Sequence, residues 1–120
     1  MSVQTLQAEL AEVRQCIRDM EVLEDWVHSL GRKVSARSDA FAGVSIDGAW
    51  GGKAAREFSN ELKRTRTTLS NGKDHTDRAS RTITFEIGLK KLEAVKLEAA
   101  ITAQKLWDAA QDALSFGGGS

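Results

Sequence analysis

The residue types that perform acid–base or metal chemistry are few in this 120-residue chain and widely separated. Asp74 and His75 lie near Ser70 and Ser80, and serine, histidine and aspartate are the residues of a nucleophilic triad. Residues on one helix project in different directions, however, and no scaffold that forms a cleft is expected. His28 lies in another segment, and no set of cysteine, histidine and carboxylate residues has metal-ligand spacing. We therefore expect no enzyme, no cofactor and no metal site.

Local charge raises a different possibility, the binding of nucleic acid. Seventeen Lys and Arg residues balance seventeen Asp and Glu residues over the whole chain. The range 63–91 is nevertheless basic, with eight positive and three negative side chains and thus a net charge of plus five. Such a face can hold phosphates. No helix-turn-helix spacing accompanies it, and the acidic range 9–25 would neutralise much of it in a hairpin. We expect no nucleic-acid or small-molecule partner, and weak nucleic-acid binding stays an alternative.

The single cysteine, Cys16, lies beside an apolar stripe and is expected to be a small core residue. It cannot close an intrachain disulfide, and the N-terminal residues lack the basic and apolar segments of a secretory signal peptide. No run of 18 apolar residues is present, so no membrane span is expected. We expect a cytoplasmic protein, with export without a signal peptide as an open alternative.

The first of two predicted helices covers about residues 2–42. Apolar residues recur every three or four positions from Val3 to Val34, as on one face of a helix. This spacing is close to the seven-residue repeat of a coiled coil. Four glycines fall within 43–52, which predicts a turn, and Asp47 is a candidate cap for the helix that follows.

The second predicted helix covers about residues 53–114 and is followed by a flexible tail at 117–120. Its middle, 70–82, is polar and contains Gly72, which is a possible break. No proline enforces a stop there, so one long helix with a loosened middle is favoured. From this region onward the apolar stripe consists of Ala79, Ile83, Ile87, Leu92, Val95, Ala99, Leu106, Ala110 and Ala113.

The two helices are expected to form an antiparallel hairpin within a single domain, 1–116. Folding the chain about the middle of the turn places Val34 near Leu62 and Val13 opposite Ile83. Two helices alone leave much of each apolar stripe exposed to water. This favours a second hairpin that completes a four-helix bundle.

The predicted turn contains Trp50-Gly51-Gly52, and two alanines and Phe58 follow it. The tripeptide alone also fits an ordinary glycine-rich turn with a buried tryptophan. Together with the chain length and a first helix of about forty residues, it resembles the WXG superfamily of small type VII secretion proteins over residues 2 to about 95. The resemblance implies a hairpin that dimerises side by side and acts as a secreted substrate or delivers larger effectors to the secretion ATPase. Phe58 is a candidate partner contact.

Two features depart from that family. Its usual C-terminal export signal, Tyr-x-x-x-Asp/Glu, is missing because the chain has no tyrosine. The second helix is also long, so that 96–116 has no counterpart in the first helix under the expected register. This overhang resembles adaptors that pair with the helical N-terminal targeting domains of LXG toxins. Its candidate partner-binding residues are Leu97, Ile101, Leu106 and Trp107, and a frayed tail or a fold-back onto the first helix are the alternatives.

These observations predict an all-α, non-enzymatic protein. We expect a WXG-like adaptor, targeting partner or secreted substrate that pairs with itself or with an LXG-type effector and promotes its export. A generic coiled-coil adaptor or scaffold, unrelated to secretion, is the alternative from another functional class.

Overall fold

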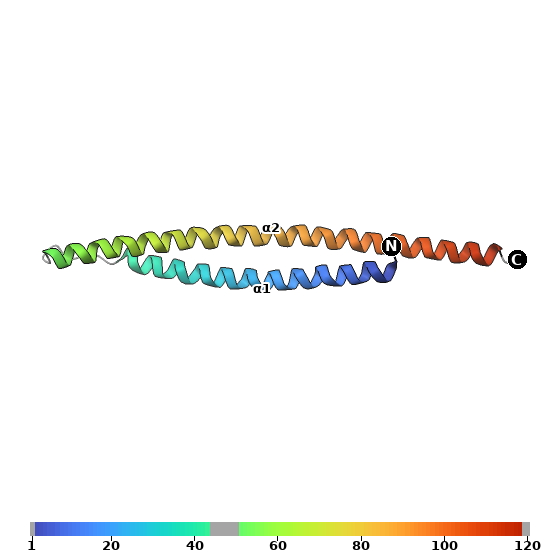
Figure 1. The fold of residues 1–120 in the computed structure, drawn as a ribbon, viewed down its shortest axis with the longest axis horizontal. Helices are drawn as coiled ribbons and strands as arrows, with labels where there is room; N and C mark the ends of the chain where they lie inside the picture. Colours follow the sequence, from blue (N-terminus) through green and yellow to red (C-terminus); the bar gives the residue numbers. More distant parts are fainter. Residues whose placement is uncertain (1, 44–50, 119–120) are drawn as a thin grey trace. The chain divides into compact units, whose positions relative to one another are not determined.

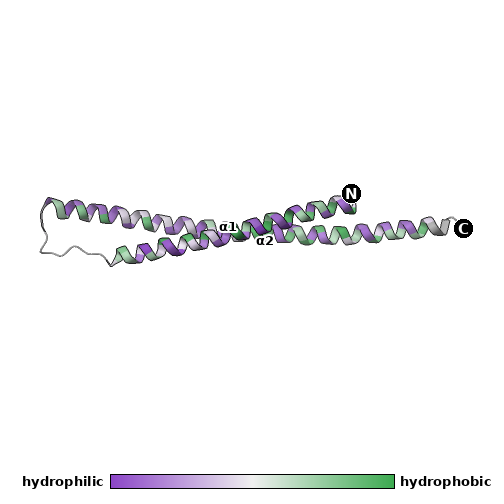
Figure 2. Cartoon of the chain, turned by 90° about the horizontal axis from the view of Figure 1, so that it is seen from below, coloured by the Kyte–Doolittle hydropathy of each residue, from purple (hydrophilic) through white to green (hydrophobic). Residues whose placement is uncertain are grey.

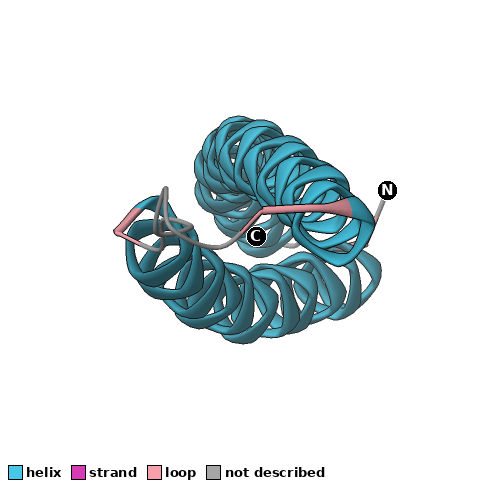
Figure 3. Ribbon diagram, turned by 90° about the vertical axis from the view of Figure 1, so that its left-hand side faces the viewer, coloured by secondary structure: helices cyan, strands magenta, loops and turns pink. Residues whose placement is uncertain are grey.

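Two long α-helices make up almost all of the described chain. The computed structural model describes residues 2–43 and 51–118, with side chains described as far as Ser115. Helix α1 covers Val3–Ala42 and helix α2 covers Lys53–Gly118 (Figure 1). No strand occurs in these described ranges, where loop is confined to the ends of the helices (Figure 3). The chain is an all-α helical hairpin, as predicted.

Local contacts account for the starts of both helices. Ser2 caps α1, because its Oγ accepts a hydrogen bond from the Thr5 backbone N–H at 3.1 Å. At the start of α2, the carbonyl of Gly52 accepts the Arg56 N–H at 3.2 Å. Gly52 has a φ of 95°, a conformation that residues with a side chain rarely adopt. A residue with a side chain would therefore be strained at this position. Asp47, the predicted cap, lies outside the described residues.

The two helices contribute to two compact units. Unit 1 combines residues 1–22 with 84–120, and unit 2 is 23–83. Helix α2 continues through Gly72 without a break, which confirms the prediction of one long second helix. The expected single domain over 1–116 stays a prediction, and each unit is described by itself below.

Unit 1 is held together by an apolar seam between α1 and α2, with hydrophobic positions recurring along both helices (Figure 2). Arg14 and Glu98 form an ion pair at 2.8 Å, and Leu10 and Ile101 line the same groove. Residue numbers therefore rise along α1 as they fall along α2, and the helices are antiparallel. The buried residues of the seam recur at intervals of three, four or seven positions. They are Leu6, Leu10, Val13, Ile17, Ile87, Ala94 and Ile101.

Unit 2 has fewer buried apolar residues, and its helices approach each other at glycines. A Cβ atom added to Gly31 would lie 3.4 Å from the hydroxyl oxygen of Thr76. On the other helix, the Cβ position of Gly72 lies 3.5 Å from Cγ1 of Val34. The described residues with buried apolar side chains in this unit are Val27, Ala55 and Leu62.

The expected register between the helices was wrong, because it assumed that the end of α1 and the start of α2 lie side by side at the turn. Val34 lies against Gly72 and not near Leu62. Arg66, more than three turns into α2, donates hydrogen bonds to the Phe41 carbonyl at 3.0 and 3.2 Å. The first turns of α2 therefore extend past the end of α1 within unit 2 (Figure 1). This guanidinium also satisfies a carbonyl at the C-terminal end of α1, where a positive charge is favourable.

A shift in the same direction is present in unit 1. The expected register placed Val13 opposite Ile83, whereas its neighbour Arg14 pairs with Glu98. Helix α1 consequently covers α2 as far as Ile101, which is buried. The expected four-helix bundle stays a prediction. Within the described residues, neither helix contains an apolar stretch long enough to cross a membrane.

Candidate interaction surface

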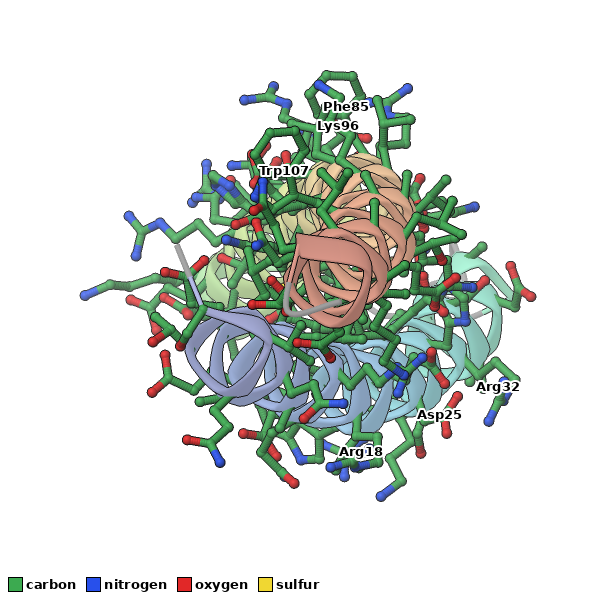
Figure 4. All side chains as sticks on the ribbon, turned by 90° about the vertical axis from the view of Figure 1, so that its right-hand side faces the viewer. Arg18, Asp25, Arg32, Phe85, Lys96 and Trp107 are labelled. Atoms are coloured by element: carbon green, nitrogen blue, oxygen red, sulfur yellow. The ribbon has the colours of Figure 1, made fainter. Side chains whose placement is uncertain are left out.

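A row of large apolar side chains is exposed along α2 in unit 1. Their exposed fractions lie between 46% and 70%. We call this row the outer face, and it consists of Phe85, Leu89, Leu92, Val95, Leu106, Trp107 and Leu114. Figure 4 shows the side chains of Phe85 and Trp107, together with that of Lys96, pointing away from α1.

The outer face lies opposite the apolar seam because of helical geometry. Each residue advances about 100° around an α-helix, so Phe85 lies ~200° from Ile87 and Trp107 lies ~240° from Ile101. Helix α2 of unit 1 is therefore apolar on two opposite sides. One side is buried against α1, and the other is in contact with water. A contiguous apolar patch on a protein surface is typical of a binding site.

Charge is unevenly distributed around this part of α2. Lys96 lies within the outer face, since it is eleven residues from both Phe85 and Trp107 and projects to the same side (Figure 4). The five acidic residues of α2 in unit 1 fall outside the outer face by the same helical geometry, and they are Glu86, Glu93, Glu98, Asp108 and Asp112. The outer face is thus apolar with one positive charge.

The predicted partner-binding residues fall into different environments. Leu106 and Trp107 are exposed on the outer face. Ile101 is buried in the seam of unit 1, so the expectation that it is uncovered was wrong. Leu97 is half-buried on the same side as Ile101. The overhang expected at 96–116 is shorter because α1 reaches further along α2 than the expected register allowed.

The predicted turn motif is described only in part. Trp50 lies outside the described residues. Gly51 has no atom within 4 Å of an added Cβ, and Gly52 has the positive φ noted above. Phe58 is partly exposed in unit 2, with an exposed fraction of 45%.

Five residues of the outer face were not among the predicted partner-binding residues, because the sequence pattern was assigned to one stripe. They are Phe85, Leu89, Leu92, Val95 and Leu114. That stripe runs from Ile87 to Leu92, a step of five residues that no single helical face produces. The pattern contains two interleaved stripes, one on the seam side of α2 and one on the outer face. Ile87 belongs to the seam, whereas Leu92 and Val95 belong to the outer face with Phe85 and Leu89. The five-residue step was the signal that could have separated them.

The polar residues considered for catalysis are arranged differently from the sequence-based triad. In unit 2, Ser80 Oγ lies 2.6 Å from Nε2 of His28 rather than pairing with His75. The two residues line a shallow groove of about 300 Å³ beside Gly31 and Thr76. Residues 2–43 and 51–118 contain no group of three His, Cys, Asp or Glu side chains placed to hold a metal ion.

Two further side chains of unit 1 have polar or sulfur contacts within the unit, Cys16 and Lys90. The thiol of Cys16 is half-buried and lies 3.8 Å from the sulfur of Met20. The pKa of Lys90 is raised above its ordinary value of 10.5, chiefly because its amine donates a hydrogen bond to Glu93 and is attracted by that carboxylate. Partial desolvation acts in the opposite direction. Neighbours within unit 1 therefore account for the contact of the Cys16 thiol and for the raised pKa of Lys90.

Comparison with known proteins gives no family assignment, since no family model, no curated protein and no solved structure matches this chain.

Proposed function

We propose that this chain is a non-enzymatic binding protein whose outer face on α2 docks another helical surface. The observation that carries the proposal is the apolar face from Phe85 to Leu114, directly opposite the seam that stabilises unit 1. Burying such a row contributes roughly 25 cal/mol per Å² of apolar area, so leaving it in water is costly. A partner that covers it would be bound mainly by its aromatic and leucine side chains.

We further propose that this binding serves type VII secretion, as a WXG-like adaptor or substrate that pairs with itself or with an LXG-type effector. The support is the Trp-x-Gly sequence in the connection between two long helices, Trp50-Gly51-Gly52. A general helical scaffold without a role in secretion would use the same outer face. The two functions differ in whether the partner is exported.

Co-expression with the product of a neighbouring toxin gene that has a helical N-terminal domain tests the proposal. We expect the two proteins to co-purify, and Trp107→Ala should weaken the complex while circular dichroism stays unchanged. Asp112→Ala is the matched control, because Asp112 is exposed on the same helix and lies ~140° around the helix from Trp107. Export of the toxin should fall in cells that carry Trp107→Ala. A complex that forms while export is unaffected would support the general scaffold instead.

A further inference from the structure

Lys96 lies midway along the outer face, between its two aromatic side chains. Each residue advances about 100° around the helix, so Phe85 lies ~20° to one side of Lys96 and Trp107 ~20° to the other. All three side chains project away from α1 (Figure 4). The two aromatic residues are ~33 Å apart along the helix axis. A helix that packs against both of them must therefore pass over Lys96.

The ammonium group of Lys96 forms no ion pair or hydrogen bond with the residues that the structure describes. Two other cations of unit 1 are paired, since Arg14 lies 2.8 Å from Glu98 and Lys90 lies 3.1 Å from Glu93. Glu93 is three positions before Lys96, which is a spacing of ion pairs on a helix, but Lys90 already binds it. The charge of Lys96 is therefore not neutralised within unit 1.

Small residues beside Lys96 leave space for a side chain of a partner. Ala99, Ala100 and Ala103 all lie within ~60° of Lys96 around the helix. Side chains on a helix lean toward its N-terminus, so the Lys96 side chain covers the turn before it and not these alanines. The distance between two packed helices depends on the size of the side chains at the contact. A partner helix can therefore approach α2 closely at the alanines and place a polar side chain beside the Lys96 ammonium.

Docking over Lys96 removes water from its charge, and this cost selects the partner. An ammonium group buried without a counter-charge is strongly unfavourable, whereas one that is hydrogen-bonded to a carboxylate is tolerated. A second copy of the outer face cannot supply that carboxylate, because the acidic residues of α2 in unit 1 lie outside it. Two outer faces in contact would bring together two lysines and no counter-charge. Charge complementarity therefore favours a helix of a different protein.

We propose that the outer face binds an amphipathic helix of a different protein, and that this helix carries an Asp or Glu within its apolar side that pairs with Lys96. This inference rests on the binding function proposed above and adds the chemistry of the partner. The apolar side chains supply most of the affinity. The ion pair discriminates against helices that lack the carboxylate, so Lys96 is a residue that determines specificity.

Binding of the full chain to the neighbouring toxin tests the ion pair through Lys96→Met, which keeps an apolar side chain of similar length and removes the charge. We expect the complex to be at least tenfold weaker, because the carboxylate of the partner would be buried without a counter-charge. Lys91→Met is the matched control, since Lys91 is exposed on the same helix and lies ~140° around it from Lys96. If Lys96→Met binds as tightly as the unmodified chain or more tightly, while Trp107→Ala still weakens the complex, the ion pair is overturned and the proposed function stands.

Carbodiimide cross-linking of the same complex locates the carboxylate, because this reagent joins a lysine amine to a carboxylate in direct contact. We expect mass spectrometry to find Lys96 joined to an Asp or Glu of the toxin. Changing that acidic residue to lysine should restore binding to Lys96→Glu, which by itself should bind at least tenfold more weakly than the unmodified chain. Cross-linking of Lys96 to a second copy of this chain would overturn the proposal. An unmodified chain that binds no helical partner would overturn both the inference and the proposed function.

Discussion

At the scale of single residues, two glycines in helical positions meet different surroundings. Gly88 faces open space, whereas Gly31 lies tightly against the Thr76 hydroxyl in unit 2. Glycine in a helix costs conformational entropy relative to alanine wherever the space allows a methyl group. The surroundings therefore decide whether a substitution stabilises or destabilises the chain.

Gly88→Ala should raise the free energy of unfolding by roughly 0.5 to 1 kcal/mol, as measured by urea denaturation at fixed protein concentration. Gly31→Ala should gain less or lose stability, because the new methyl group would lie 3.4 Å from the Thr76 oxygen. Equal gains at both positions would contradict the close approach of the helices at Gly31.

Gly52→Ala should destabilise the chain by about 1 to 2 kcal/mol, since alanine is strained at the observed φ of 95°. Gly51→Ala is the control, because this neighbouring position has open space and no positive φ. Thermal denaturation of both variants measures the difference. A Gly52→Ala variant as stable as the unmodified protein would show that the start of α2 does not need this backbone conformation.

The amine of Lys90 should titrate above pH 10.5, because Glu93 accepts its hydrogen bond at 3.1 Å. A pKa raised by folding contributes stability that is fully present below pH 10.5 and is lost as the pH rises through the higher, folded pKa. Nuclear magnetic resonance titration of the Lys90 side chain measures the shift. In Glu93→Gln the pKa should move back toward 10.5, whereas Glu86→Gln should have a smaller effect.

At the scale of the helix, shortening a side chain in the seam of α2 should lower stability, whereas shortening one in the outer face should weaken partner binding. Ile101→Ala should cost about 2 to 5 kcal/mol of stability, because Ile101 is buried against α1 in unit 1. Trp107→Ala should cost much less in the isolated chain, since its side chain is 62% exposed, but should weaken partner binding strongly. Denaturation and binding measured on both variants separate the two roles.

The helices themselves follow from local sequence patterns, and their arrangement does not. Periodicity from Val3 to Val34 and the absence of proline were sufficient to predict α1 and an unbroken α2. The register between α1 and α2 depends on how far α2 runs past the end of α1. The hydrogen bond from Arg66 to the Phe41 carbonyl shows this offset, and no local sequence pattern encodes it. The outer face was merged with the seam because both consist of apolar residues on one helix.

At the scale of the whole molecule, the buried apolar residues are distributed unequally between the units. Seven of the described buried side chains belong to unit 1, and three, Val27, Ala55 and Leu62, belong to unit 2. The contacts between the helices in unit 2 include the approach of Gly31 to Thr76, the exposed pair of His28 and Ser80, and the hydrogen bonds of Arg66 to Phe41. Fewer buried apolar contacts favour local opening.

Amide hydrogen exchange should therefore be faster in residues 28–41 of α1 than in residues 6–19 of the same helix. The comparison within one helix removes differences in helix type and solvent conditions. Val13→Ala should accelerate exchange in 6–19, because it removes a buried side chain from the seam of unit 1. Uniform protection along α1 would contradict the unequal stability of the units.

Because the seam and the outer face occupy opposite sides of α2, evolution can alter one with little effect on the other. Amino-acid changes at Phe85, Leu92 or Trp107 can redirect the protein to a new partner while its abundance in the cell is maintained. Changes at Ile87, Ala94 or Ile101 should lower abundance whatever the partner is, since misfolded chains are degraded. Paired mutational scans, one for cellular abundance and one for complex formation, should therefore separate α2 into two sets of positions that lie on different sides of the helix.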